Sequence, residues 1–303
     1  MASTQKRTMG MDLGGTTASF IDMVSPDEVF NAKTIKTPKN LDEFVKSLVD
    51  VLRGMLSAKK NPAPAGIGIA IAGQVNPQRK SVIFSPHLPI KKEYPLGAEI
   101  EKQIGLPVFM ENDANGAAVG EKIYGAAQGM DDFISITLGT GLGSGIFANG
   151  KLVTGYMGAG GEAGHMVIDP NGPKCNCGNN GCLETFCSGH ALTRMALERM
   201  GEEKTGKEIC EAAVAGDETA IAILREAGER LGDGLVSLVN LFNPEGIFFC
   251  GSLANAPDIY FEPAFRKVRE KSFGTSGKKL PLAVSPLKDN IGVIGAAALS
   301  ALA

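Results

Sequence analysis

Residues 165–184 read HMVIDPNGPKCNCGNNGCLE. The metal-binding side chains of this segment are one histidine and three cysteines: His165, Cys175, Cys177 and Cys182. They form a complete tetrahedral ligand set for zinc, and the asparagines and glycines between them favour turns that bring the sulfur atoms together. Because such a site leaves no position for water, we expect a structural ion that fixes Glu162 and Glu184 nearby. A reduced cysteine cluster without metal and a disulfide are the alternatives.

The composition of the whole chain is typical of a soluble globular protein. The chain has 303 residues, of which 44% are hydrophobic, and a formal net charge of -3. This length suggests roughly two domains, and the charge leaves no electrostatic footprint for nucleic acid. Six cysteines in so long a chain do not indicate a secreted disulfide scaffold. We find neither a signal peptide nor an apolar run of about 18 residues, so we expect a cytoplasmic protein with no membrane span.

Two glycine-rich turns each join one predicted strand to another. The buried strand Thr8–Leu13 leads through residues 14–17 into a second strand, and residues 132–138 lead in the same way through residues 139–145. Because a strand follows each turn, neither turn is a strand-to-helix phosphate loop of a dinucleotide-binding or P-loop protein. Glycines let backbone N–H groups approach phosphate oxygens closely. The repeat therefore predicts two halves of similar fold, each with a phosphate-binding turn.

Two aspartates lie at the ends of predicted strands. Asp12 ends the first strand and is placed to position Mg²⁺, directly or through water, although an ordinary hairpin turn is the alternative. Asp113 lies between a short strand at residues 107–110 and a small-residue helix at residues 114–124. Ligands of open α/β sheets bind at the carboxyl ends of strands, which favours a functional Asp113. Capping of the helix by Asn112 or Asp113 is the alternative.

Together these motifs resemble the ROK family (repressors, open reading frames and sugar kinases). The matching segments are DLGGT at 12–16, ENDAN at 111–115, LGTGLG at 138–143, GEAGH at 161–165 and CxCGxxGCxE at 175–184. The resemblance implies an α/β, actin-like ATPase (RNase H-like) fold, with two α/β domains around a central cleft and a structural zinc loop. We expect an N-terminal domain at residues 1–115 and a C-terminal domain at residues 116–290. A final helix at residues 291–303 would pack back on the first domain.

The resemblance also implies a role for individual residues. Asp113 matches the catalytic base, which takes the proton from a sugar hydroxyl as it attacks ATP. The implied sugar contacts are Gly73, Asn112, Asp113, Glu162, His165 and Glu184. The implied nucleotide contacts are Asp12, Gly14, Gly15, Thr16, Thr17, Thr140, Gly141 and Gly251. His165 would bind zinc through one ring nitrogen and the sugar through the other.

The function implied by the resemblance is an ATP-dependent hexose kinase that phosphorylates the 6-hydroxyl of an aldohexose. The expected cofactors are ATP, Mg²⁺ and structural Zn²⁺, and the expected assembly is a homodimer. The segments at residues 85–89 and 182–189 are similar to the allose kinase branch, so glucose and allose both remain candidates. His87, in the first of these segments, is a candidate for substrate selection. An N-acetylhexosamine kinase and a non-catalytic sugar-sensing protein are the alternatives within the family.

Other classes of protein fit the sequence less well. A repressor of this family carries a helix-turn-helix domain before the first hairpin, and only seven residues precede Thr8, so we expect no nucleic-acid partner. A dinucleotide-dependent enzyme is disfavoured because the glycine turns lead into strands. A zinc-stapled binding module without activity is disfavoured by the presence of Asp113.

Overall fold

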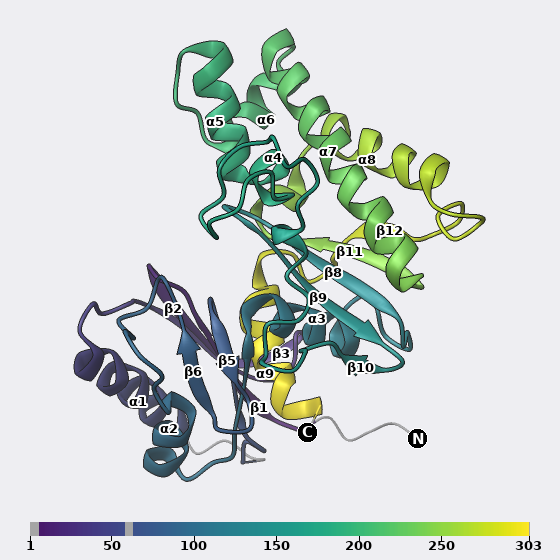
Figure 1. Cartoon of the computed structure of the whole chain (residues 1–303). Helices are drawn as coiled ribbons and strands as arrows, with labels where there is room; N and C mark the ends of the chain where they lie inside the picture. Colours follow the sequence, from purple (N-terminus) through teal and green to yellow (C-terminus); the bar gives the residue numbers. More distant parts are fainter. Residues whose placement is uncertain (1–5, 58–62, 303) are drawn as a thin grey trace. The chain divides into compact units, whose positions relative to one another are not determined.

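The computed structural model describes residues 6–57 and 63–302, which form two compact units (Figure 1). The first unit comprises Met1–Gly129, Leu152–Gly160 and Asp289–Ala303, and the second comprises Met130–Lys151 and Gly161–Lys288. The sequence places the domain boundary after residue 115. In the structure, however, helix α3 (Asp113–Tyr124) packs against helix α9 (Ile291–Leu302) within the first unit. We therefore propose a domain boundary near residue 129.

The first unit is built on a five-stranded sheet with the order β3-β2-β1-β4-β7. The strands are β1 (Thr8–Leu13), β2 (Thr17–Ser25), β3 (Glu28–Lys36), β4 (Ile67–Ile71) and β7 (Val108–Asn112). β1, β2 and β3 are antiparallel, whereas β4 and β7 run parallel to β1. Two further strands, β5 (Gln74–Asn76) and β6 (Ser81–Phe84), form a separate hairpin. The carboxyl ends of β1, β4 and β7 therefore meet at one edge of the main sheet.

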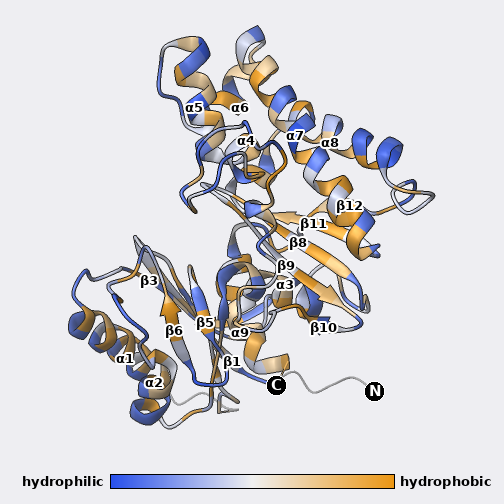
Figure 2. Cartoon of the chain, viewed as in Figure 1, coloured by the Kyte–Doolittle hydropathy of each residue, from blue (hydrophilic) through white to orange (hydrophobic). Residues whose placement is uncertain are grey.

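Helices cover both faces of this sheet. On one face, α1 (Leu41–Ser57) and α2 (Leu96–Ile104) share a core with the side chains of β1, β4 and β7. The apolar stripe of α1 is buried, as its helical spacing predicts, and Phe44, Leu48 and Leu52 are fully shielded from solvent. On the other face lies α9, which is largely apolar in Figure 2 and contacts β1 and β4.

The contact between α9 and the sheet depends on two glycines. Gly10 of β1 and Gly68 of β4 are register partners on the face that α9 covers. A Cβ atom at Gly10 would lie 2.5 Å from the amide nitrogen of Ala297, and one at Gly68 would overlap the carbonyl oxygen of Ala296. The small side chains of α9 therefore let the helix backbone lie directly on the strands.

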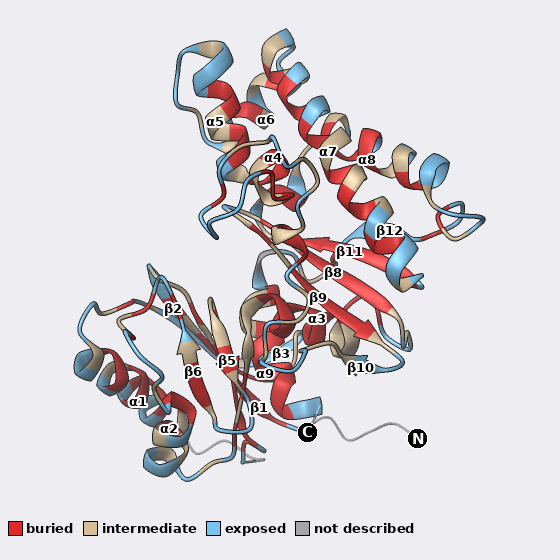
Figure 3. Ribbon diagram, in the orientation of Figure 1, coloured by how far each residue is buried: buried red, intermediate tan, exposed pale blue. Residues whose placement is uncertain are grey.

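The second unit repeats this arrangement with the strand order β10-β9-β8-β11-β12. Its strands are β8 (Phe133–Leu138), β9 (Leu142–Ala148), β10 (Lys151–Leu152), β11 (Gly246–Cys250) and β12 (Leu282–Val284). β8 and β9 are antiparallel, whereas β11 and β12 continue parallel to β8. The central strands β8 and β11 are almost wholly buried (Figure 3). The common strand order confirms the prediction of two halves of similar fold.

The second unit also contains helices, which lie on one side of its sheet in Figure 1. They are α4 (Glu184–Cys187), α5 (Gly189–Met200), α6 (Gly206–Val214), α7 (Glu218–Phe242) and α8 (Asp258–Lys271). Short 3₁₀ helices lie at Ala163–His165, Ser252–Asn255 and Lys288–Asn290. Within the described ranges, 6–57 and 63–302, no helix combines the length and the apolarity needed to cross a membrane.

Candidate functional site

The first glycine turn, residues 14–17, connects β1 to β2 and is held from behind. The hydroxyl of Thr37 donates a hydrogen bond to the carbonyl of Gly14 at 2.6 Å. The side-chain amine of Lys39 donates one to the carbonyl of Gly15 at 2.8 Å. A Cβ atom at Gly15 would lie 2.7 Å from Cβ of His87, so the turn packs directly on the His87 loop. Thr16 and Thr17 are exposed. The structure thus presents two exposed threonines on a turn whose backbone is held by hydrogen bonds. Phosphate binding by this turn stays a prediction.

Asp12 lies at the end of β1 beside Asp113. Burial, and then the negative charge of Asp113, raise the pKa of Asp12 from its ordinary value of 3.8 to about 6. The first turn of α9 closes over the same carboxylate, because a Cβ atom at Gly292 would overlap it. Two neighbouring carboxylates in a partly enclosed place are suited to attract a divalent cation.

Asp113 begins α3 directly after β7. Asn112 caps this helix, since its Oδ1 accepts hydrogen bonds from the backbone of Ala114, at 2.9 Å, and of Asn115, at 3.3 Å. The Asn112 Nδ2 donates to the carbonyl of Gly73 at 3.1 Å. Capping by Asn112 therefore occurs, and it places Asp113 at the start of α3, at the sheet edge. A catalytic role for Asp113 stays a prediction. The structure brings together Gly73, Asn112 and Asp113, three of the predicted sugar contacts.

The second glycine turn lies in the second unit, where α5 supports it. The amides of Gly189 and His190 donate to the carbonyls of Gly139, at 2.8 Å, and of Thr140, at 3.1 Å. The side chain of Thr140 is exposed, like those of Thr16 and Thr17 in the first turn. The main chain of this turn is therefore fixed by hydrogen bonds while its hydroxyl faces solvent.

Gly251 follows β11 and adopts a conformation that favours glycine. Its φ is 89°, and a Cβ atom there would overlap the carbonyl oxygen of Leu138. The residue thus lets the chain turn sharply beside the end of β8. Its contact with a nucleotide stays a prediction.

The four predicted zinc ligands converge in the second unit. Nδ1 of His165 lies 3.6 Å from Sγ of Cys175, and the Sγ atoms of Cys177 and Cys182 are also 3.6 Å apart. All four ligand atoms lie within 4.8 Å of one another. Zn–S bonds of ~2.3 Å and Zn–N bonds of ~2.0 Å place tetrahedral ligands roughly 3.5–3.8 Å apart, so the cluster fits zinc. All six cysteines are described and free, which argues against the disulfide alternative.

We call residues 165–184 the zinc loop. Glu184 is its last residue and Glu162 precedes it, and the two glutamates have different environments. Glu184 begins α4, and its Oε2 accepts a hydrogen bond from the backbone of Leu142 at 2.9 Å. The carboxylate also lies against Gly141, where a Cβ atom would overlap it. Glu162 is exposed, and its carbonyl accepts the amide of His165 at 3.0 Å. The structure therefore joins Glu184 to the second glycine turn and Glu162 to the zinc loop.

The sequence analysis missed several side chains that lie next to these residues. Lys174, His190 and Arg194 line a pocket together with Glu184. No sequence pattern predicted that these side chains would lie together, because the zinc loop and α5 come together only in the folded chain.

Comparison with known proteins links these motifs to one family. The model of the ROK family matches residues 8–302. The chain is 32% identical over 310 residues to a glucokinase of Thermotoga maritima, covering 97% of this chain and 96% of that protein. It is 34% identical over 230 residues to the xylose repressor of Bacillus subtilis, covering 76% of this chain and 59% of the repressor. The chain is also similar to a solved structure of a ROK family glucokinase from Streptomyces griseus in complex with glucose and AMPPNP. The TM-score is 0.82 and the sequence identity 32%, and the match covers 98% of this chain and 100% of that chain.

Proposed function

The chain belongs to the ROK family, and we propose that it is an ATP-dependent hexose kinase that phosphorylates the 6-hydroxyl of an aldohexose. The observation that carries this proposal is the position of Asp113, at the carboxyl end of β7 and beside Asp12. A protein that only binds a sugar has no need for a general base. A kinase needs one carboxylate to accept a proton and one to hold the nucleotide's cation.

In the proposed reaction, Asp113 accepts the proton of the attacking hydroxyl. The capping bonds of Asn112 fix the start of α3 and so orient the Asp113 carboxylate. A positioned base typically contributes ~10²–10⁴-fold in rate. The proton moves to a carboxylate oxygen of Asp113 while the sugar oxygen forms its bond to phosphorus and the ADP oxygen leaves.

The remaining contribution is electrostatic. We assign the phosphate contacts to the two glycine turns, with Gly14, Gly15, Thr16 and Thr17 in one and Thr140 and Gly141 in the other. Asp12 would hold Mg²⁺ directly or through water, and the ion would neutralise charge on the transferred phosphoryl group. Backbone donors that are already fixed need no reorganisation during the reaction.

We assign sugar recognition to Gly73, Asn112, Glu162, His165 and Glu184, in addition to Asp113. His165 directs Nδ1 to the cysteine cluster, which leaves Nε2 for a sugar hydroxyl. The zinc ion would thus act only by holding His165 and the zinc loop in place.

We favour glucose as the substrate because similar proteins are named glucokinases, and allose remains the alternative. Two other proposals have support from relatives. A solved structure described as a putative N-acetylmannosamine kinase from Listeria monocytogenes is 28% identical to this chain, with a TM-score of 0.81. The similar xylose repressor of Bacillus subtilis is named as a repressor and not as an enzyme. An N-acetylhexosamine kinase and a sugar sensor without catalysis are therefore the competing functions.

A panel of sugars separates these proposals. We would measure ADP release from Mg-ATP with glucose, allose, mannose, N-acetylglucosamine and N-acetylmannosamine. We expect the highest kcat/KM with glucose. A preference for an N-acetylated sugar would replace the aldohexose, and sugar binding by calorimetry without ADP release would support the sensor. His87→Asn tests the loop that packs on Gly15, and unchanged relative kcat/KM values would exclude a selective role for His87.

A further inference from the structure

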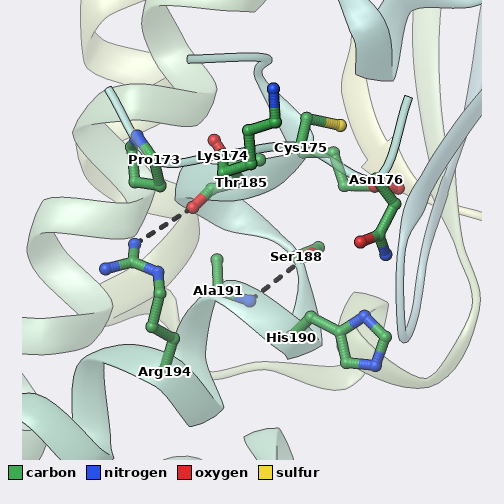
Figure 4. Close-up of a pocket in the computed structure, with 10 residues that line it drawn as sticks. Pro173, Lys174, Cys175, Asn176, Thr185, Ser188, His190, Ala191 and Arg194 are labelled. Carbon is green, nitrogen blue, oxygen red and sulfur yellow. Dashed lines mark hydrogen bonds between the residues drawn. The ribbon is translucent and has the colours of Figure 1, made fainter. Parts of the chain in front are cut away.

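Arg194 lies in the second turn of α5, and its side chain reaches the main chain of α4 (Figure 4). Its Nη2 donates a hydrogen bond to the carbonyl of Thr185 at 3.1 Å. Thr185 directly follows Glu184, one of the proposed sugar contacts. The main chain beside Glu184 is therefore held by a side chain from another helix.

The short helix α4 depends on such support. It is a single turn of four residues, and an isolated helix of this length is not stable in water. Its N-cap residue, Leu183, provides no side-chain hydrogen bond. The carbonyls at the end of a helix need donors from elsewhere. Arg194 supplies one to Thr185, and the hydroxyl of Tyr260 supplies one to Cys187 at 2.6 Å.

The two donors differ in how far they are buried. Tyr260 is fully buried, so its replacement would disturb the core of the second unit. The side chain of Arg194 is 36% exposed. Arg194 can therefore be replaced without opening the core, and the effect of its hydrogen bond can be measured separately.

Thr185 also connects Arg194 to the zinc loop. Its amide and its hydroxyl both donate to the carbonyl of Cys182, at 2.9 and 2.7 Å. Cys182 is one of the predicted zinc ligands. Hydrogen bonds thus fix the main chain on both sides of Glu184, while the Glu184 carboxylate accepts the amide of Leu142 at 2.9 Å.

Glu198 sets the orientation of the Arg194 guanidinium. Nη1 of Arg194 donates to both carboxylate oxygens of Glu198, at 2.7 and 3.0 Å, one turn further along α5. A guanidinium is planar and its donors point in fixed directions, so this pair leaves Nη2 directed at Thr185. Because Glu198 offsets its charge, Arg194 acts here through geometry and not through attraction of an anion.

We propose that Arg194 is a positioning residue for Glu184. By its hydrogen bond to Thr185 it fixes α4, and so it fixes the carboxylate that contacts the sugar. The inference rests on the proposed function, because it takes Glu184 as a sugar contact. Loss of Arg194 should therefore raise KM for the sugar, whereas kcat should change less, because Asp113 belongs to the first unit.

Calorimetry of sugar binding without nucleotide tests the proposal. The titrant is the sugar that gives the highest kcat/KM in the panel, which we expect to be glucose. Arg194→Met removes the donors and keeps an unbranched side chain. It should raise Kd roughly 3- to 10-fold, as the loss of one hydrogen bond of modest net strength would. Glu198→Ala should raise Kd by a smaller factor, because it frees Arg194 to turn away.

The matched control is Arg199→Met. Arg199 lies in the same helix, its side chain is 35% exposed, and it pairs with Glu226 of α7 at 2.5 Å. This variant should bind the sugar as the wild type does. Equal loss of affinity in Arg199→Met and Arg194→Met would overturn the proposal, because the loss would then come from α5 as a whole.

A double-mutant cycle with Glu184→Gln separates positioning from a general loss of structure. If Arg194 acts through the Glu184 carboxylate, Arg194→Met should weaken sugar binding in the wild type and add little in the Glu184→Gln background. Fully additive losses would overturn the proposal. All variants keep the four predicted zinc ligands, so their zinc content should be equal. Loss of zinc from Arg194→Met would contradict an effect confined to α4.

Hydrogen–deuterium exchange of residues 183–188, followed by mass spectrometry without any ligand, gives a readout that needs no sugar. Exchange should be faster in Arg194→Met than in the wild type and in Arg199→Met. Unchanged exchange would overturn the proposal, and so would faster exchange with unchanged sugar affinity. Absence of both sugar binding and ADP release by the wild type would instead mark failure of the proposed kinase.

Discussion

Asp12 and Asp113 form the proposed chemical centre of the first unit, although they belong to different strand ends. β1 delivers Asp12 and β7 is followed by Asp113, with β4 between the two strands. Because these strands are parallel, their carboxyl ends meet at one sheet edge and bring the carboxylates together. Burial, and then the charge of Asp113, make ionisation of Asp12 unfavourable, as its raised pKa indicates.

Asp113→Asn should lower kcat by ~10²–10⁴-fold, because the amide cannot accept the sugar proton. The variant keeps the size and shape of the side chain, so KM for the sugar should change little. Steady-state kinetics of wild type and variant give both numbers. An active Asp113→Asn enzyme would assign the base to another residue.

Asp12→Asn should stabilise the protein above pH 6 in the absence of nucleotide and Mg²⁺. The folded-state pKa of about 6 lies above the ordinary value of 3.8, so ionisation of Asp12 costs stability in the folded state. The cost is absent below pH 4, grows between pH 4 and 6, and then reaches at most about 3 kcal/mol.

Chemical denaturation of wild type and Asp12→Asn at pH 4 and pH 7.5 measures this effect. The two proteins should have similar free energies of unfolding at pH 4, and the variant should be the more stable one at pH 7.5. The same variant should lose kinase activity if Asp12 positions Mg²⁺. A variant that is less stable than the wild type at pH 7.5 would contradict the unfavourable ionisation of the buried Asp12 carboxylate.

At the level of elements, the packing of α9 on the first sheet requires glycine. Gly68→Ala would place a methyl group against the backbone of Ala296, and such overpacking typically costs ~1–3 kcal/mol. Gly54→Ala is the matched control, because it lies in α1 with nothing within 4 Å of the added Cβ. The control should gain up to ~1 kcal/mol from helix propensity. Equal unfolding midpoints for the two variants would contradict the close approach of α9.

The zinc loop is the second element with a clear prediction. Cys182→Ser should lose zinc, lower the thermal unfolding midpoint and abolish activity, because Cys182 precedes Glu184 by two residues. The binding free energy of structural zinc, about 10–16 kcal/mol in small zinc domains, is an upper limit for this loss of stability. Cys210→Ala, on α6 and outside the cluster, should keep zinc and activity. Zinc content by atomic absorption and differential scanning fluorimetry distinguish the two variants.

At the level of the whole molecule, short-range patterns predicted most of the fold. The spacing of one histidine and three cysteines predicted the metal cluster. The two strand–turn–strand segments predicted paired halves, which share one strand order. Both signals are local, so a single sequence contains them.

Other features were not predictable because their signals are weak or tertiary. The N-cap residue of α2, Pro95, provides no side-chain hydrogen bond, so the start of this helix has no clear signal. All three residues of β12 are partly or fully exposed, so this strand shows no periodicity. Helix α3 packs against α9, and Lys174 and His190 line the same pocket. Both arrangements bring together residues that are distant in the sequence. Short-range patterns do not encode such contacts.

The most direct test of the central claim is ³¹P NMR of the zinc-loaded protein with Mg-ATP and glucose, beside the same mixture with Asp113→Asn. The account predicts that the wild type converts ATP to ADP and a sugar phosphate in equal amounts, and that the folded variant forms neither at a comparable rate. ATP that stays intact with the wild type and every sugar of the panel would contradict the kinase.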